Sequence, residues 1–108
     1  MSEPNVSALS ALGVAQQVSA NNIANADTDG FKASSVAFES GPEGEGVRVA
    51  DIRRSTSAGP FVDGAEGSNT DIGRDMVDMI STGHAFSANV AAVRASEEMT
   101  GHLLDMIA

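Results

Sequence analysis

The chain has 108 residues, a length that allows one small domain. It contains no Trp, no Tyr and only four Phe, so a core built within one chain has few large side chains to bury. The formal net charge of -9 argues against nucleic acid or an anionic membrane as a partner, and the absence of Cys excludes disulfides and thiolate metal sites.

The first predicted element is a helix over residues 5–26. Leu9, Leu12, Gln16, Ser19, Ile23 and Ala26 recur at intervals of three and four residues, which is the period of one helix face. Gly30 follows a short polar run and is expected to close the helix in the left-handed conformation.

The middle of the chain, residues 31–67, has a different composition. A Gly- and Glu-rich tip over 41–46 separates Val36-Ala37-Phe38 from a segment over 47–52 that is rich in β-branched residues. This arrangement predicts a short β-hairpin. Residues 55–67 hold three Gly and one Pro, so we expect an irregular connector there.

The last predicted element is a long helix from Ile72 to Ile107, about 54 Å at about 1.5 Å per residue. Ser68 and Asp71 suggest a capping box before it. A seam with steps of four and three residues indicates a coiled-coil helix. Its positions are Ile72, Met76, Met79, Gly83, Phe86, Val90, Val93, Glu97, Thr100, Leu104 and Ile107.

These elements predict a mainly α fold. Long N- and C-terminal helices form a coiled-coil-like pair, with a small β-hairpin and irregular insert between them. The expected parts are an N-terminal helix with an Asn-rich motif (1–32), a short β/irregular insert (33–67) and a C-terminal coiled-coil helix (68–108). The apolar stripe of the last helix is too long for this chain to cover, so we expect it to face other subunits as well.

The Asn-rich stretch over 19–32 reads Ser-Ala-Asn-Asn-Ile-Ala-Asn-Ala-Asp-Thr-Asp-Gly-Phe-Lys. It resembles the N-terminal motif of flagellar basal-body rod, hook and hook-associated proteins, Ala-Asn-Asn-x-Ala-Asn-x-x-Thr-x-Gly-Phe-Lys. Every defined position is matched, by Ala20, Asn21, Asn22, Ala24, Asn25, Thr28, Gly30, Phe31 and Lys32.

The C-terminal helix carries a second resemblance to the same family. It rests on Asn69, the run Asp-Met-Val-Asp-Met-Ile over 75–80, Phe86, Ala88-Asn89 and Glu98-Met99. The segment over 46–50 is similar to one that precedes this helix in the short proximal rod proteins. The resemblance implies a helical coaxial tube, paired terminal helices, and export in an unfolded state through the flagellar type III apparatus. That route fits the expected absence of a general secretory signal.

The candidate site residues are those expected at subunit contacts. Asn22 and Asn25 are poor choices for a helix interior, and such amides can fix register between neighbouring helices. Seam residues of both helices and one aromatic complete the set. The full set is Leu9, Leu12, Asn22, Ile23, Asn25, Phe31, Ile72, Met76, Met79, Phe86, Asn89, Val90, Val93, Leu104 and Ile107.

No motif indicates catalysis, a cofactor or a metal. His84 and His102 are about 27 Å apart on one helix, so they cannot share an ion within one chain. Ser, His and Asp lack a nucleophile elbow, and the glycines over 41–46 lack the Lys-Ser/Thr of a phosphate loop. No run of about 18 apolar residues predicts membrane insertion.

Two functions remain open from sequence. The first is a structural subunit of the periplasmic proximal rod of the flagellum, with no small-molecule substrate. Its partners would be other copies of itself, other rod subunits and the export apparatus. The second is a soluble helical adaptor or export-associated protein that binds one partner by helix packing. Polymer formation distinguishes the two, because an axial subunit builds open helical assemblies.

Overall fold

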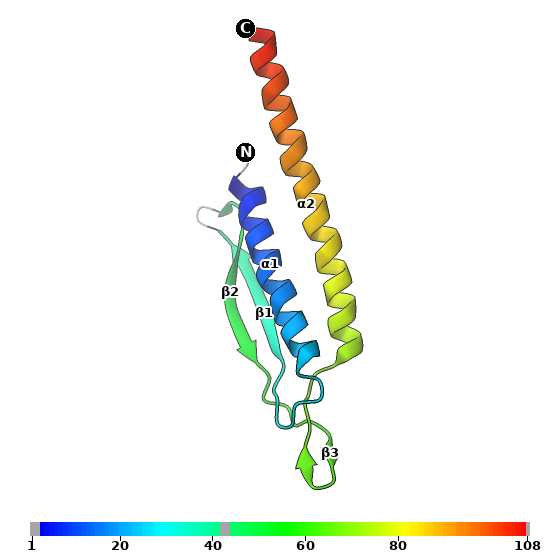
Figure 1. The fold of residues 1–108 in the computed structure, drawn as a ribbon. Coiled ribbons are helices and arrows are strands. Elements are labelled where there is room, and N and C mark those ends of the chain that lie inside the picture. The colour runs from blue at the N-terminus through cyan, green and yellow to red at the C-terminus, as the bar shows by residue number, and fades with distance from the viewer. Residues whose placement is uncertain (1–2, 42–43, 108) are drawn as a thin grey trace.

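The computed structural model describes residues 3–41 and 44–107, the side chains of residues 3, 4 and 107 excepted. The molecule is elongated, with extents of 73 × 26 × 14 Å. Two helices account for most of it, α1 (Glu3–Ala24) and α2 (Ile72–Ile107) (Figure 1). Between them in sequence lie four strands: β1 (Ser34–Ser40), β2 (Val47–Arg54), β3 (Phe61–Val62) and β4 (Ala65–Glu66).

Helix α1 ends earlier than the sequence pattern indicated. It stops at Ala24, and the next turn begins where the Asn25 N–H donates to the Asn21 carbonyl at 3.1 Å. Gly30 does adopt a positive φ of 70°, but it lies six residues beyond the helix. The expectation that Gly30 closes the helix is therefore wrong. Its N–H instead donates to the Glu66 carbonyl at 2.8 Å, and the positive φ lets the chain turn toward the connector.

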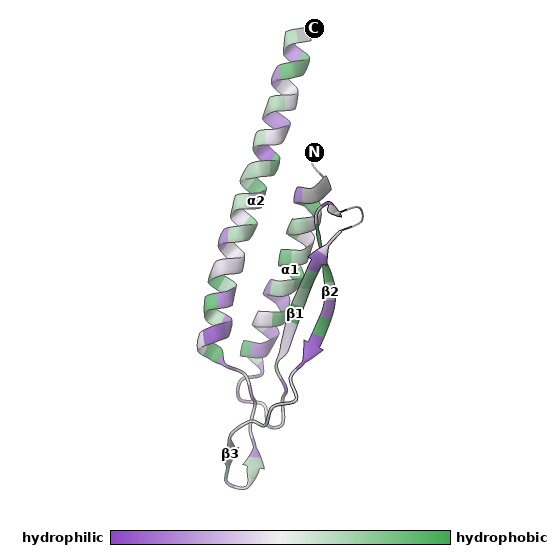
Figure 2. Ribbon diagram, turned by 180° about the vertical axis from the view of Figure 1, so that it is seen from behind, coloured by the Kyte–Doolittle hydropathy of each residue, from purple (hydrophilic) through white to green (hydrophobic). Residues whose placement is uncertain are grey.

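Strands β1 and β2 form the predicted antiparallel hairpin. A bulge between Ala37 and Phe38 leaves Ala50 without a partner on β1. The hairpin packs along α1 and is fixed near both ends of that helix. The Val47 N–H donates to Ser7 Oγ at 3.1 Å, and the Ser34 N–H donates to Asn22 Oδ1 at 2.9 Å. Helix α1 thus lies between the hairpin and α2 (Figures 1 and 2).

The connector over 55–67 is more regular than expected, because it contains a second hairpin of β3 and β4. Asp63 and Gly64 join the strands with φ values of 52° and 81°. Two successive positive φ values match the two-residue turn whose twist suits a hairpin, and an Asp-Gly pair is its usual sequence. Gly59 lies so close to Gly67 that an added Cβ would stand 2.2 Å from the Gly67 carbonyl oxygen.

Helix α2 spans Ile72–Ile107, as predicted. Its cap differs from the expected one. Asp71 Oδ1 accepts the Arg74 N–H at 3.1 Å, so Asp71 caps the helix. Ser68 Oγ accepts the Thr70 N–H at 3.1 Å and takes no part in a capping box.

The two helices pack side by side and run in opposite directions (Figure 1). The half-buried or buried positions of α2 show which face it turns inward: Asp75, Met79, Thr82, Gly83, Ala85, Asn89, Val90, Val93 and Ser96. This face is rotated from the expected seam, since Ile72 and Met76 are exposed. A coiled-coil geometry for the pair stays a prediction. From Glu97 to Met106 every side chain of α2 is exposed, because α1 does not reach that far.

The interior is small and mostly polar. Among the described side chains, Ala11 is the one buried apolar residue. Four polar residues are buried: Ser19, Asn22, Ser68 and Asp75. The shortage of aromatic residues therefore has the consequence expected from composition, a chain with little apolar core of its own.

Hydrogen exchange of the dilute protein should show that α2 is less stable beyond the end of α1 than beside it. We expect amides of residues 97–106 to exchange at least about tenfold faster than those of residues 79–93, which corresponds to about 1.4 kcal/mol less protection. Mass spectrometry of peptides from each segment measures this. Equal protection of both segments in a monomer would show that α2 is stabilised along its whole length.

Candidate interaction site

Asn22, in the last turns of α1, joins three elements of the fold. Its side chain is 2% exposed. Nδ2 donates to the Ser34 carbonyl at 2.8 Å and to Asp75 Oδ1 at 3.3 Å, while Oδ1 accepts the Ser34 N–H at 2.9 Å. The amide therefore pairs with both backbone groups of one β1 residue, as a neighbouring strand would, and also reaches α2.

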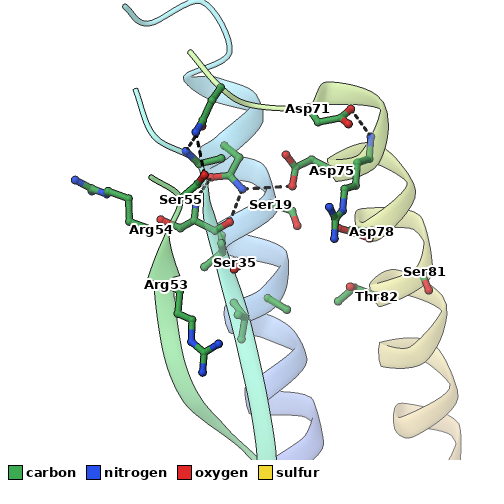
Figure 3. A pocket seen from close by; sticks show the side chains of 18 of the residues that line it. Ser19, Ser35, Arg53, Arg54, Ser55, Asp71, Asp75, Asp78, Ser81 and Thr82 are labelled. Carbon is green, nitrogen blue, oxygen red and sulfur yellow. Dashed lines mark hydrogen bonds between the residues drawn. The ribbon is translucent and has the colours of Figure 1, made fainter. Parts of the chain in front are cut away.

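Asp75 is the α2 partner of Asn22 and is 9% exposed. Its position in the first turn of α2 places an acidic side chain near the positive end of the helix dipole, a favourable location for such a residue. Figure 3 shows Asp75 turned toward α1, with a dashed line for its bond to the amide. Together with the bond that Gln16 Nε2 donates to the Met79 carbonyl at 3.2 Å, this contact joins α1 to the inward face of α2.

The residues before α2 attach the helix to the end of the Asn-rich motif. Thr70 Oγ1 donates to the Asn22 carbonyl at 3.0 Å. Asn69 accepts the Ala33 N–H at 2.6 Å and donates to the Ser57 carbonyl at 2.9 Å. One side chain of the C-terminal segment thus holds the start of the hairpin and the connector together.

Lys32, the last residue of the motif, fixes the connector. Its ammonium pairs with Glu66 and donates to the Ser57 carbonyl at 2.9 Å. Glu66 Oε1 also accepts the Gly59 N–H at 2.9 Å. The hydrogen bond from Lys32, followed by that from Gly59, holds the pKa of Glu66 below its ordinary value of 4.5.

Two groups of large apolar side chains on α2 are exposed, one toward each end of the helix, and Phe86 is exposed between them. The lower patch, near the start of the helix, consists of Ile72, Met76, Val77 and Ile80, which are between 46% and 64% exposed. The second group lies on residues 97–107, here called the overhang. It consists of Met99, Leu103, Leu104 and Met106, between 60% and 82% exposed. Figure 2 shows apolar residues on α2 beyond the level of the N-terminus.

The predicted site residues fall into three groups by burial. Asn22 is buried, and its polar atoms bond within the chain. Half-buried positions are Leu9, Leu12, Ile23, Asn25, Phe31, Met79, Asn89, Val90 and Val93, and exposed ones are Ile72, Met76, Phe86 and Leu104. The side chain of Ile107 lies outside the described residues. For all of these positions, contact with another subunit stays a prediction.

Asn25 has a local role in the structure. Its Nδ2 donates to the Asn21 carbonyl at 2.9 Å, and its Oδ1 accepts from Thr28 Oγ1 at 3.1 Å. These bonds shape the turn that follows α1. Asn89 likewise donates to the Ala85 carbonyl of its own helix at 2.9 Å.

The sequence analysis missed Asp75, Asn69 and Lys32 as residues that hold the fold together. Asn69 and Lys32 had a signal, because both belong to the stretches that carry the family resemblance. Asp75 also belongs to such a stretch and lies in the first turn of a helix, which suggests a favourable dipole contact, but neither signal indicates a particular partner. No helix in the described part of the chain is long and apolar enough to cross a membrane.

Comparison with known protein families gives two matches, one at each end of the chain. Residues 5–32 match the family described as Flagella basal body rod protein. Residues 64–106 match the family described as Flagellar basal body rod FlgEFG protein C-terminal. Together the two segments make up about two thirds of the chain, and they include both helices. No curated protein matches the chain.

Replacing Asn22 with Ala should destabilise the chain by roughly 1–3 kcal/mol, because the half-buried Ser34 backbone groups and the buried Asp75 carboxylate lose their partner. Chemical denaturation followed by circular dichroism measures the change. Asn21→Ala is the matched control: Asn21 is exposed, so we expect a change within about 0.5 kcal/mol. Equal effects of the two substitutions would contradict the role given to Asn22.

The Lys32–Glu66 pair should make the connector sensitive to acid. The folded pKa of Glu66 is lowered, so its stabilising contribution is present above the unfolded value of about 4.5 and is lost as the pH falls through the folded pKa. We expect amide exchange of residues 57–67 to accelerate over this range. Glu66→Gln should remove that acid-dependent change. An unchanged pH profile in Glu66→Gln would assign the acid sensitivity to another group.

Proposed function

Because the chain belongs to the flagellar basal-body rod family, we propose that it is a subunit of the proximal part of the rod, which assembles through its terminal helices into an axial tube. Proteins of this family are structural components of the flagellar basal body and are not enzymes.

The observation that carries the proposal is where the exposed apolar side chains lie. Most of the large ones are on the terminal helices, the two elements that the family matches include. On α2 they occur at both ends, in the lower patch and in the overhang. Apolar surface of this extent on a small chain is typical of a protein that buries it against partners.

The polar interior supports the same proposal. With little apolar core, one chain gains little from burial, and the overhang gains nothing from α1. Packing of helices between neighbouring subunits would supply the missing burial. An assembled tube is therefore the state in which this fold is fully stabilised.

The proposed partners are other copies of the chain and other rod subunits, in the periplasmic section of the basal body. The proposed route to that place is the flagellar type III export apparatus. A chain without Cys, and with little core to unfold, suits passage in an extended state. The competing function, a helical adaptor with one partner, would need a single docking face, whereas α2 carries separate apolar groups at its two ends.

Ile80→Asp tests the proposal at the lower patch. Ile80 is 63% exposed, so the single chain should fold normally, with an unchanged circular dichroism spectrum and thermal transition. In the assembled rod the carboxylate would be buried without a partner, which costs several kcal/mol. We expect incorporation into purified basal bodies to fall below about a tenth of the wild-type amount.

The control for this test is Thr56→Asp, which adds the same charge at an exposed position of the connector, away from both helices. It should incorporate normally. Normal incorporation of Ile80→Asp would remove the lower patch from the assembly surface. Absence of the wild-type chain from basal bodies would refute the proposed function itself.

A further inference from the structure

The outer edge of β1 has a hydrogen-bonded partner at one point, and that partner is an amide. The Asn22 side chain bonds to both backbone groups of Ser34 and also donates to Asp75 Oδ1 on α2 at 3.3 Å. A carboxamide has the donor and the acceptor of a peptide group. Asn22 therefore shows how a peptide group fits between the edge of β1 and the side chains of α2.

Further along β1 the same edge has no partner. Residues of an antiparallel strand alternate between bonding the neighbouring strand and pointing away from it. The Ser55 N–H donates to the Ala33 carbonyl across the hairpin at 2.8 Å, so the backbone groups of Ser34, Val36 and Phe38 point outward. The bulge adds its extra residue to β2 and leaves this alternation intact. Among the described residues, the outward backbone groups of Val36 and Phe38 have no hydrogen-bond partner.

A hollow of about 550 Å³ lies beside this free edge, between β1 and α2 (Figure 3). Val36 and Phe38 line it on the β1 side, and Asp78, Ser81 and Thr82 line it on the α2 side. The walls are open to solvent, since Phe38 is 46% exposed and Asp78 and Ser81 are exposed as well. Pairing along the edge would use the backbone of β1 and the side chains of α2, and it would leave the buried side chains of α1 as they are.

The two walls of the hollow have polar groups at similar intervals. Strand β1 and helix α2 run in the same direction (Figure 1). From Ser34 to Phe38 the strand rises about 13 Å at about 3.3 Å per residue, and from Asp75 to Thr82 the helix rises about 10 Å at about 1.5 Å per residue. A strand lying in the hollow would therefore have Asp78 and Thr82 on its far side, as the amide already has Asp75.

From these observations we propose that an extended segment of another protein adds to the free edge of β1 as a third strand. Main-chain hydrogen bonds to Val36 and Phe38 would hold it, over about four or five residues. A second copy is a poor source of this segment, because each strand in the described part of the chain is already paired within a hairpin. The inference goes beyond the proposed function and holds whether or not the chain is a rod subunit.

The surroundings of the hollow determine which side chains the segment carries. Every second side chain of an added strand would point toward α1, where Ala15 and Val18 line the hollow, so these side chains should be apolar.

Charge favours a basic segment. The α2 wall has three carboxylates and one guanidinium, those of Asp71, Asp75, Asp78 and Arg74. On the hairpin side, Arg53 is paired with Asp51, and Arg54 points away from α2 (Figure 3). The whole chain carries a formal net charge of -9, which attracts a basic partner and repels an acidic one. The expected partner is therefore an extended segment with alternating apolar residues and with Lys or Arg between them.

A synthetic peptide tests the proposal on the purified full-length chain. The probe is Thr-Val-Lys-Val-Lys-Val-Thr, amidated and labelled with a neutral fluorophore, and fluorescence anisotropy measures its binding. We expect saturable binding. The same peptide with an N-methyl group on each Val keeps the side chains but loses the donors that would face β1, and it should bind at least about tenfold more weakly. Replacing both Lys with Glu in the peptide should weaken binding by a similar factor. Equal binding of the N-methylated peptide would overturn the inference.

Two proline substitutions distinguish the free edge of β1 from the opposite edge of the hairpin. Val36 and Ile52 face each other across the hairpin, and each turns its N–H away from the other strand. Proline at either position removes an outward donor and no hydrogen bond of the ladder. Val36→Pro should weaken peptide binding at least about tenfold, whereas the matched control Ile52→Pro should change it by no more than about twofold. Circular dichroism checks that both variants fold, and equal affinities of the two folded variants would contradict the proposal.

Amide exchange of the wild-type chain, followed by nuclear magnetic resonance, locates the bound peptide without any substitution. The amides of Val36 and Phe38 should gain protection when the peptide is added, and that of Ile52 should not. Protection of Ile52 alone, or of none of the three, would show that no strand is added to β1.

The occupant in cells is identified by a photoreactive benzophenone amino acid in place of Ser81, an exposed residue that lines the hollow. Mass spectrometry then sequences the segment that becomes linked after irradiation. A basic, alternating segment of another protein supports the proposal when its synthetic peptide also protects the amides of Val36 and Phe38. A link to a second copy of the chain would overturn it.

Discussion

The side-chain amide of Asn22 is the contact on which the arrangement of this chain depends. It pairs with both backbone groups of Ser34 and with the carboxylate of Asp75, and so connects α1 to the hairpin on one side and to α2 on the other. In a chain whose one described buried apolar side chain is Ala11, such bonds replace a core as the source of specific geometry. A polar interior of this kind fixes orientation well and contributes modest net stability.

The bond to Asp75 has a consequence along the whole of α2. It turns Asp75 inward, which brings Met79 and Val93 toward α1 and leaves Ile72 and Met76 outside. The helix therefore keeps apolar side chains free for other molecules. The length of α2 adds to this, because it continues past α1 and exposes Leu103 and Leu104. In the proposed assembly, both features would leave apolar surface for contact with neighbouring subunits.

The polar side chains of the Asn-rich motif bond mostly within the chain. Asn25 shapes the turn after α1, and Lys32 holds the connector through Glu66 and the Ser57 carbonyl. In the C-terminal segment, the Asn69 side chain accepts a hydrogen bond from the Ala33 N–H and donates one to the Ser57 carbonyl of the connector. The two stretches that carry the family resemblance thus meet at one end of the molecule. Their shared role is to set the hairpin and both helices in place.

The sequence by itself determined the elements whose cause is local. Apolar spacing predicted both helices and the end points of α2, β-branched residues around a Gly-rich tip predicted the β1–β2 hairpin, and the motifs predicted the family. The Asp63-Gly64 turn was equally local and was overlooked. Only the tertiary structure decided the rotation of α2 and the buried position of Asn22. Each of these depends on contacts between residues far apart in the chain, such as Asn22 and Asp75, and no periodicity within one segment encodes its partner.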